Sequence, residues 1–161
     1  MVCEEGKKMN MYYLYDINKE GYNKILDYLY KNCEMFYLVE PMADSEDFPE
    51  ELPSPKDNLV EYLIERKRVT SWAGTKIKIK NKKRKAVEHS YRCCKNSVEK
   101  LRFYESFFEY DDQMDIAFFK DNQCVLFAIT HEEILMVDMD FWQGFFKTIP
   151  CSIIKAKNFK W

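Results

Sequence analysis

The chain has 161 residues, of which 47% are hydrophobic and 32% charged, and its formal net charge is -2. This length and composition predict one globular domain, residues 1–161, and exclude bulk disorder. The net charge argues against attraction of the whole protein to nucleic acid, and the four glycines form no run that could cradle a phosphate. No apolar run could span a bilayer or act as a signal peptide, so we expect a cytoplasmic protein. Nucleotide-binding motifs of the Walker or dinucleotide type are absent, and we expect no cofactor.

The first forty residues alternate between strand and helix signals. Residues 11–17 (MYYLYDI) and residues 35–40 (MFYLVE) are rich in the residue types that strands favour. Between them apolar residues recur at helical spacing, and Asn18 can cap that helix. The apolar residues are Tyr22, Ile25, Leu26, Leu29 and Cys33. Strand, helix and strand in this order indicate a βαβ unit or an α+β variant of it.

Residues 42–55 are rich in proline and acidic residues and predict a surface loop. Two roles are open for it. It could be a solvated connector, or it could bind a partner, with its acidic residues steering association and a phenylalanine anchoring the complex. The candidate partner-binding residues are Asp44, Glu46, Asp47, Phe48, Glu50 and Glu51.

The motif SPKD at residues 54–57 predicts the start of a helix, with Ser54 as its cap. The apolar stripe of this helix would be Leu59, Val60, Leu63 and Ile64. Glu61, Glu65 and Lys67 would then lie on its solvated face, which we favour over the carboxylate cluster of a metal-dependent nuclease.

A basic hairpin is predicted next. Residues 76–80 alternate Lys and Ile, residues 81–85 form a basic turn, and residues 86–93 return as an antiparallel strand. The positive charges could protect an edge strand from pairing with other chains, or they could bind nucleic acid. The candidate nucleic-acid-binding residues are Lys76, Lys78, Lys80, Lys82, Lys83, Arg84 and Lys85. Just before them, Gly74 predicts a bend that lets Trp72 pack.

The second half of the chain begins with a predicted helix over residues 96–110, in which Asn96 and Glu99 have capping-box spacing. Apolar runs at residues 114–119 and 124–129 flank the turn KDNQ and predict central strands. Residues 133–138 predict a further strand, and residues 140–149 a short helix capped by Asp138 or Asp140. Together these elements predict an α+β fold, a mainly antiparallel sheet of about five or six strands packed by about three or four helices.

His131, followed by Glu132 and Glu133, has the residue types of a general-base site. A zinc-protease motif would need a second histidine one helical turn later, where Leu135 stands. We therefore expect the stretch THEE to close a strand, and an enzyme centred on His131 is a lesser alternative. The six cysteines lack zinc-ligand spacing, so we expect reduced thiols and no metal. They are Cys3, Cys33, Cys93, Cys94, Cys124 and Cys151.

Residues 115–133, DIAFFKDNQCVLFAITHEE, form a predicted buried hairpin after a capped helix. In this pattern, and in its size, few glycines and segregated charge, the chain resembles the small bacterial immunity proteins that neutralise toxin domains. The resemblance implies a stoichiometric inhibitor without activity of its own, and it carries over no individual residue. We therefore expect a protein-binding module rather than an enzyme, with nucleic-acid binding through residues 76–85 as the alternative.

Overall fold

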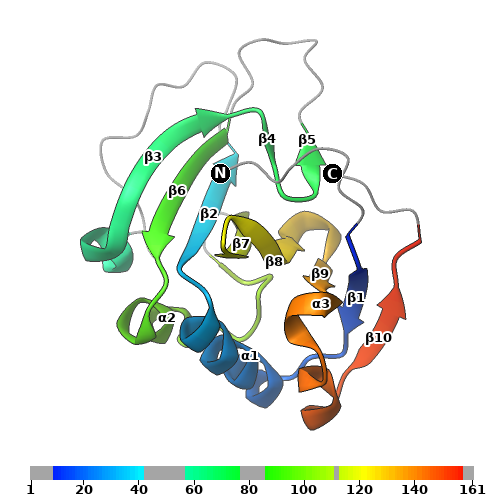
Figure 1. The fold of residues 1–161 in the computed structure, drawn as a ribbon. Coiled ribbons are helices and arrows are strands. Elements are labelled where there is room, and N and C mark those ends of the chain that lie inside the picture. The colour runs from blue at the N-terminus through cyan, green and yellow to red at the C-terminus, as the bar shows by residue number, and fades with distance from the viewer. Residues whose placement is uncertain (1–8, 42–56, 77–85, 111–112, 158–161) are drawn as a thin grey trace.

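An eight-stranded antiparallel sheet organises the chain in the computed structural model, which describes residues 9–41, 57–76, 86–110 and 113–157. Its strands are β1 (Met11–Tyr15), β2 (Met35–Pro41), β3 (Leu63–Val69), β6 (Ala86–Arg92), β7 (Asp115–Lys120), β8 (Gln123–Ile129), β9 (Ile134–Asp138) and β10 (Ser152–Lys155). They lie in the order β10-β1-β9-β8-β7-β2-β6-β3 and form a strongly twisted surface (Figure 1). A separate hairpin is formed by β4 (Ser71–Trp72) and β5 (Thr75–Lys76).

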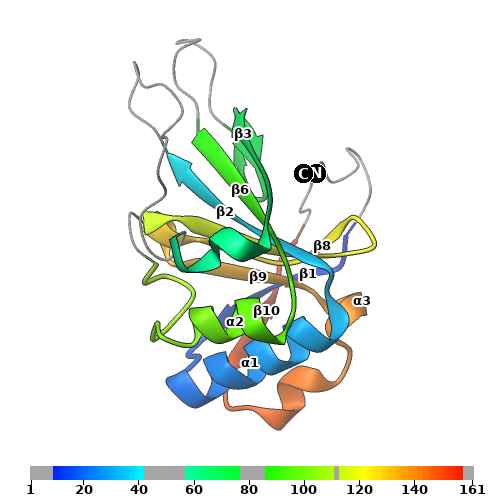
Figure 2. The ribbon, with the colours of Figure 1, turned by 90° about the vertical axis from the view of Figure 1, so that its left-hand side faces the viewer.

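Three α-helices and three short 3-10 helices are found among the described residues. The α-helices are α1 (Lys19–Asn32), α2 (Lys95–Leu101) and α3 (Met139–Trp142), and the 3-10 helices are η1 (Asp57–Tyr62), η3 (Thr130–Glu132) and η4 (Phe145–Thr148). Figure 2 shows α1, α2 and α3 gathered beneath one face of the sheet. None of the helices in the described part of the chain is long and apolar enough to cross a membrane.

The predicted start of α1 is confirmed. The side chain of Asn18 accepts a hydrogen bond from the backbone N–H of Gly21 at 2.8 Å, which satisfies one of the free donors of the first turn. The helix connects β1 to β2, which are parallel because β9, β8 and β7 lie between them in antiparallel steps. The strand–helix–strand unit is therefore real, but three later strands are inserted into it.

The predicted hairpin at the centre of the sheet is also confirmed. Strands β7 and β8 pair with each other and occupy the two middle positions of the sheet. Asp121 and Asn122, in the turn KDNQ, both have positive φ, 50° and 65°, as a tight two-residue hairpin turn requires. Both strands are almost entirely buried, which agrees with their continuous apolar sequence.

The predicted number of strands is wrong, since the sheet has eight rather than five or six. Residues 63–69, the first two of which belong to the predicted apolar helix stripe, form β3, which pairs with β6 from Leu63 to Val69. Ser54, the predicted cap, lies outside the described residues, and within them only η1 remains of that helix, because the long pairing with β6 outweighs the local helical pattern. The short strand β10, which has no alternating pattern, is a further addition. The helix predicted over residues 96–110 ends at Leu101, and its N-cap is Cys94 rather than Asn96: the Cys94 N–H donates to Oγ of Ser97 at 3.0 Å, so the capping box predicted for Asn96 and Glu99 is wrong.

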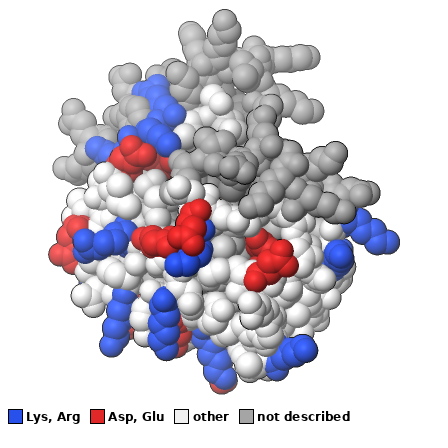
Figure 3. Space-filling view, in the orientation of Figure 1, with Lys and Arg blue, Asp and Glu red and all other residues white. Residues whose placement is uncertain are grey.

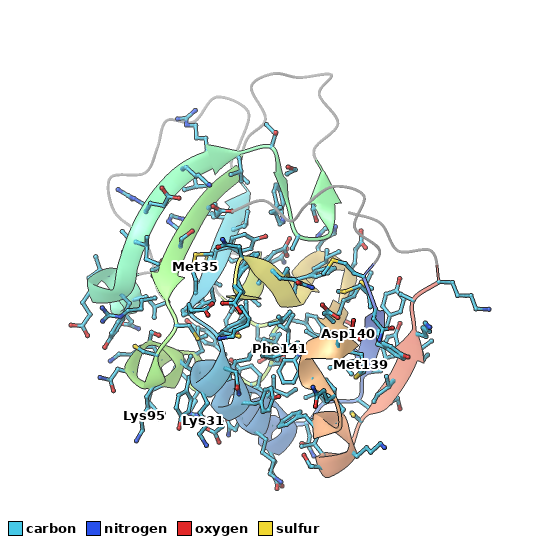
Figure 4. All side chains as sticks on the ribbon, viewed as in Figure 1. Lys31, Met35, Lys95, Met139, Asp140 and Phe141 are labelled. Atoms are coloured by element: carbon cyan, nitrogen blue, oxygen red, sulfur yellow. The ribbon has the colours of Figure 1, made fainter. Side chains whose placement is uncertain are left out.

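The helices close one face of the sheet with aromatic side chains. Trp142, at the end of α3, is 1% exposed, and its indole N–H donates to the carbonyl of Val125 at 2.8 Å. Tyr28 of α1 stacks on Trp142 with ring centroids 4.9 Å apart and also contacts Phe141, which lies between α3 and α1 (Figure 4). Each buried aromatic contributes roughly 1.5–3 kcal/mol, so these contacts fix α1 and α3 to the sheet.

The β4–β5 hairpin packs on the opposite face of the sheet. Gly74, at its tip, has φ +79°, and a Cβ there would lie 2.4 Å from a ring carbon of Phe127. The Ala73 N–H donates to the hydroxyl of Tyr37 at 2.7 Å. The bend predicted at Gly74 is thus confirmed, and it places the hairpin backbone in direct contact with the second apolar core.

Candidate functional site

The ends of three neighbouring strands meet at one end of the sheet. Pro41, the last residue of β2, pairs with Ala86, the first residue of β6, and Ala86 also pairs with Val69, the last residue of β3. Residues 42–56 follow Pro41, and residues 77–85 precede Ala86, so the acidic and the basic segment both join the sheet here. We call residues 38–41, 65–69 and 86–90 the charged end.

The residues predicted to bind a partner lie outside the described residues. This holds for all six acidic-loop candidates, Asp44, Glu46, Asp47, Phe48, Glu50 and Glu51. It also holds for Lys78, Lys80, Lys82, Lys83, Arg84 and Lys85, while Lys76 ends β5 and only its backbone is described. The structure therefore places the points where the two segments join the sheet, and both binding hypotheses stay predictions.

Lys67 on β3 lies between two carboxylates of the charged end. Its Nζ is 3.4 Å from Oε2 of Glu88 and 3.7 Å from Oε1 of Glu65. Glu88 lies directly opposite Lys67 on β6, and its side chain is almost completely buried. A carboxylate removed from water needs a cation beside it. The charge of Lys67 is therefore used within the protein and is largely neutralised toward an external partner.

His89 is fully buried on the other face of β6. Its Nε2 lies 3.5 Å from Oε2 of Glu40, which is diagonal to it on β2 and therefore on the same face. Arg66 occupies the position directly opposite His89 on β3. An imidazole without solvent access cannot meet a substrate, so we assign His89 a structural role together with Glu40.

The stretch THEE closes β8, as the sequence predicts. Thr130 begins η3, and its N–H donates to Oδ1 of Asp115 at 2.8 Å. The side chain of His131 is 62% exposed, and its Nε2 lies 3.4 Å from Oε1 of Glu132. Strands β7 and β2 lie between β8 and β6, which carries His89, so the two histidines do not share a site.

The three residues with the types of a metal-dependent nuclease do not share one helix face. Glu61 belongs to η1, and Glu65 and Lys67 belong to β3. Both glutamates are exposed, which agrees with the solvated surface expected for them. Within the described ranges, no group of three His, Cys, Asp or Glu side chains could hold a metal ion.

The cysteines that the structure describes form no disulfide with one another. Burial raises the pKa of the Cys93 thiol to about 12 and also raises that of Cys33. Both thiols therefore stay protonated near neutral pH and are poor nucleophiles.

Sequence reasoning missed the role of Asp115, the first residue of β7. Its side chain is buried and accepts two hydrogen bonds, from the indole N–H of Trp72 and from the backbone N–H of Thr130, both at 2.8 Å. One carboxylate thus joins the β4–β5 hairpin and the end of β8 to β7. The sequence feature that indicates this role is an acidic residue at the start of the apolar run DIAFF, because a carboxylate buried there requires hydrogen-bond donors.

Charges of both signs are interspersed on the face of the molecule seen in Figure 3. Comparisons of the chain with protein-family models, with curated protein sequences and with solved structures found no match.

Proposed function

We propose that the protein is a protein-binding module that acts by surface complementarity, as a stoichiometric inhibitor or immunity-type protein that neutralises a toxin domain. The supporting observation is the pairing of Pro41 with Ala86 at the charged end. Through this pairing an acidic segment and a basic segment start from adjacent positions on a rigid sheet. Segments of both signs that join the sheet at adjacent positions suit a protein partner, which carries charges of both signs itself.

Nucleic acid is the less suitable partner because its backbone carries one sign of charge. A phosphate-binding surface needs positive side chains that are free of carboxylate partners. In the charged end, Lys67 is already paired with Glu88 and Glu65. Binding of nucleic acid through the basic residues 76–85 remains the alternative, and a pull-down distinguishes it from binding of a protein.

For a toxin domain that cleaves nucleic acid, the matching surface would be the acidic loop. The active cleft of such a toxin is basic because it must hold phosphates. Asp44, Glu46, Asp47, Glu50 and Glu51 would steer association, and Phe48 would anchor the complex. Charges at the rim of an interface mainly raise the association rate, whereas a buried aromatic mainly slows dissociation.

The first experiment is a pull-down from the source cell with the tagged full chain, analysed by mass spectrometry. We expect a protein that stays bound at one-to-one stoichiometry after a nuclease treatment and a high-salt wash. Recovery of nucleic acid alone, released by high salt, would refute the proposal and favour the basic segment.

The second experiment measures association and dissociation rates with the purified partner. Changing the five acids of the loop to their amides should slow association about tenfold or more at low salt. Phe48→Ala should speed dissociation about thirtyfold, as the loss of a hot-spot residue does. The matched controls change five exposed glutamates elsewhere to glutamine, and Phe103, a strongly exposed aromatic, to alanine. The glutamates are Glu20, Glu105, Glu109, Glu132 and Glu133. Equal effects of loop variants and controls would show that the loop only connects two elements.

A further inference from the structure

The two edges of the sheet differ in how they are protected. Strand β3 forms one edge, and its middle residues are the charged run at residues 65–68. Strand β10 forms the other edge and pairs only with β1 among the described strands. All four of its residues are exposed, and Ile153 and Ile154 are 40% and 56% exposed. Charged residues commonly protect an edge from pairing, so β3 is a guarded edge and β10 an open one.

The hydrogen bonds to β1 determine which backbone groups of β10 point outward. The N–H of Ala156 donates to the carbonyl of Met11 at 3.0 Å. Because bonding positions alternate along an antiparallel strand, Ile154 and Ser152 also face β1. Ile153 and Lys155 therefore direct their N–H and C=O groups away from the sheet, and no other described residue bonds to them. These groups can be satisfied by another extended strand.

We propose that the occupant of this edge is β10 of a second copy of the chain, paired antiparallel about a two-fold axis through Ile154. In this register Ile153 of each copy faces Lys155 of the other, and each pair exchanges both backbone hydrogen bonds, about four bonds in all. The two Ile154 side chains meet at a non-hydrogen-bonded position, where opposing side chains are closest. Ile154, the most exposed apolar residue of the strand, is thereby covered by Ile154 of the second copy.

The neighbouring registers are less favourable. Shifting the axis to Lys155 would oppose two ammonium groups, which is destabilising in a sheet. Shifting the axis to Ile153 would place Ile154 opposite Ser152 and leave it without an apolar partner. In the proposed register, the methylene stem of Lys155 can instead lie along Ile153 on the other face. Tyr15, which pairs with Ser152 and is itself exposed, adds apolar surface beside the axis.

The area of such a contact is small, because β10 has only four residues. A stable interface usually buries more than about 1,000 Å². We therefore expect a dimer that dissociates at low concentration, with both copies presenting their charged ends away from the contact.

Sedimentation of the full chain over a wide concentration range tests the dimer. We expect a reversible monomer–dimer equilibrium that is lost in Ile154→Lys. It should also be lost in Lys155→Pro, which removes an outward N–H without removing a bond to β1. The matched control is Ile64→Lys, since Ile64 is 57% exposed at the other edge and should tolerate the change. Circular dichroism of each variant checks that the fold is kept.

Cysteine crosslinking tests the register. Opposed Cα atoms at a non-hydrogen-bonded position are about 4.5 Å apart, within disulfide range. Under mild oxidation Ile154→Cys should give a covalent dimer beyond the wild-type background, and Ile153→Cys should not. A chain that is monomeric at every concentration, a dimer that survives both edge variants, or crosslinking through Ile153→Cys alone would overturn the proposal.

Discussion

Gly74 provides a direct test of how the β4–β5 hairpin is held on the sheet. In Gly74→Ala the new Cβ would lie 2.4 Å from a ring carbon of Phe127 and 2.9 Å from Cδ1 of Ile129. The backbone must also keep φ near +79°, which costs an L-residue about 1–2 kcal/mol. Relieving the overpacking costs about a further 1–3 kcal/mol. We therefore expect a loss of about 2–5 kcal/mol, a large part of a typical total stability of about 5–15 kcal/mol.

The assay is urea unfolding followed by far-ultraviolet circular dichroism, and Gly144→Ala is the matched control. Nothing lies within 4 Å of a Cβ at Gly144, and its φ is -84°. That substitution should change the free energy of unfolding by less than about 1 kcal/mol. Release of the hairpin without unfolding would instead expose the Ala73 amide, which is bonded to Tyr37, to hydrogen exchange. The reasoning is refuted if the two variants have equal stability and the Ala73 amide stays protected.

Buried tyrosines, cysteines and the exposed histidine give three more tests. Burial holds the pKa of Tyr22 and of Tyr110 above the ordinary value of 10.0. The stability that these tyrosines contribute is therefore complete below about pH 10 and is lost as the pH rises toward their pKa in the folded protein. Spectrophotometric titration should show both tyrosines ionising only on unfolding, and their ionisation in the folded protein would contradict this. Burial acts to raise the pKa of Cys94, but hydrogen bonds at the start of α2 lower it overall, whereas burial raises that of Cys93 to about 12. Alkylation of the native protein should therefore modify Cys94 first, and the reverse order would argue against these environments. His131→Ala should change the free energy of unfolding by less than about 0.5 kcal/mol, because the ring is exposed, and a loss of about 2 kcal/mol would reveal a contact that the structure lacks.

The parts of the fold that the sequence predicts are those fixed by neighbours along the chain. Asn18 caps α1 through a bond to a residue three positions later. The turn at Asp121 and Asn122 joins two strands that are adjacent in sequence and in space. In both cases the residue types that determine the structure lie within one short window, so a local pattern contains the necessary information.

The errors arise where distant residues decide the structure. Residues 57–64 have apolar residues at helical spacing, yet β3 forms because it pairs with β6, in which the paired residues lie between 17 (Val69 with Ala86) and 28 (Leu63 with Tyr91) positions later in the sequence. Strand β10 likewise depends on β1, at the other end of the chain. Pairing of this kind adds hydrogen bonds and buried surface that cannot be predicted from a short stretch of sequence, and it overrides a modest helix propensity.

The candidate site shows the same limitation for charges. Glu88 and His89 stand next to each other in the strand sequence AVEHSYR, yet they lie on opposite faces of β6 and have different partners, Lys67 for one and Glu40 for the other. Alternation along a strand predicts the opposite faces. It does not predict the partners, which come from β3 and β2, and without partners a buried charge cannot be distinguished from a solvated one.

The β10 edge and the strand from which the acidic loop starts lie apart on the sheet, which makes the two proposals separable by experiment. Five steps in the strand order lead from β10 to β2, the nearest strand of the charged end, a path of about 24 Å along the sheet. Effects of substitutions at sites that share no partner normally add independently. Ile154→Lys should therefore abolish self-association and leave partner binding through the acidic loop unchanged, while amides in place of the five loop acids should do the reverse. Loss of both properties in either variant, with the fold kept, would mean that one surface serves both contacts, and the two proposals would then not be independent.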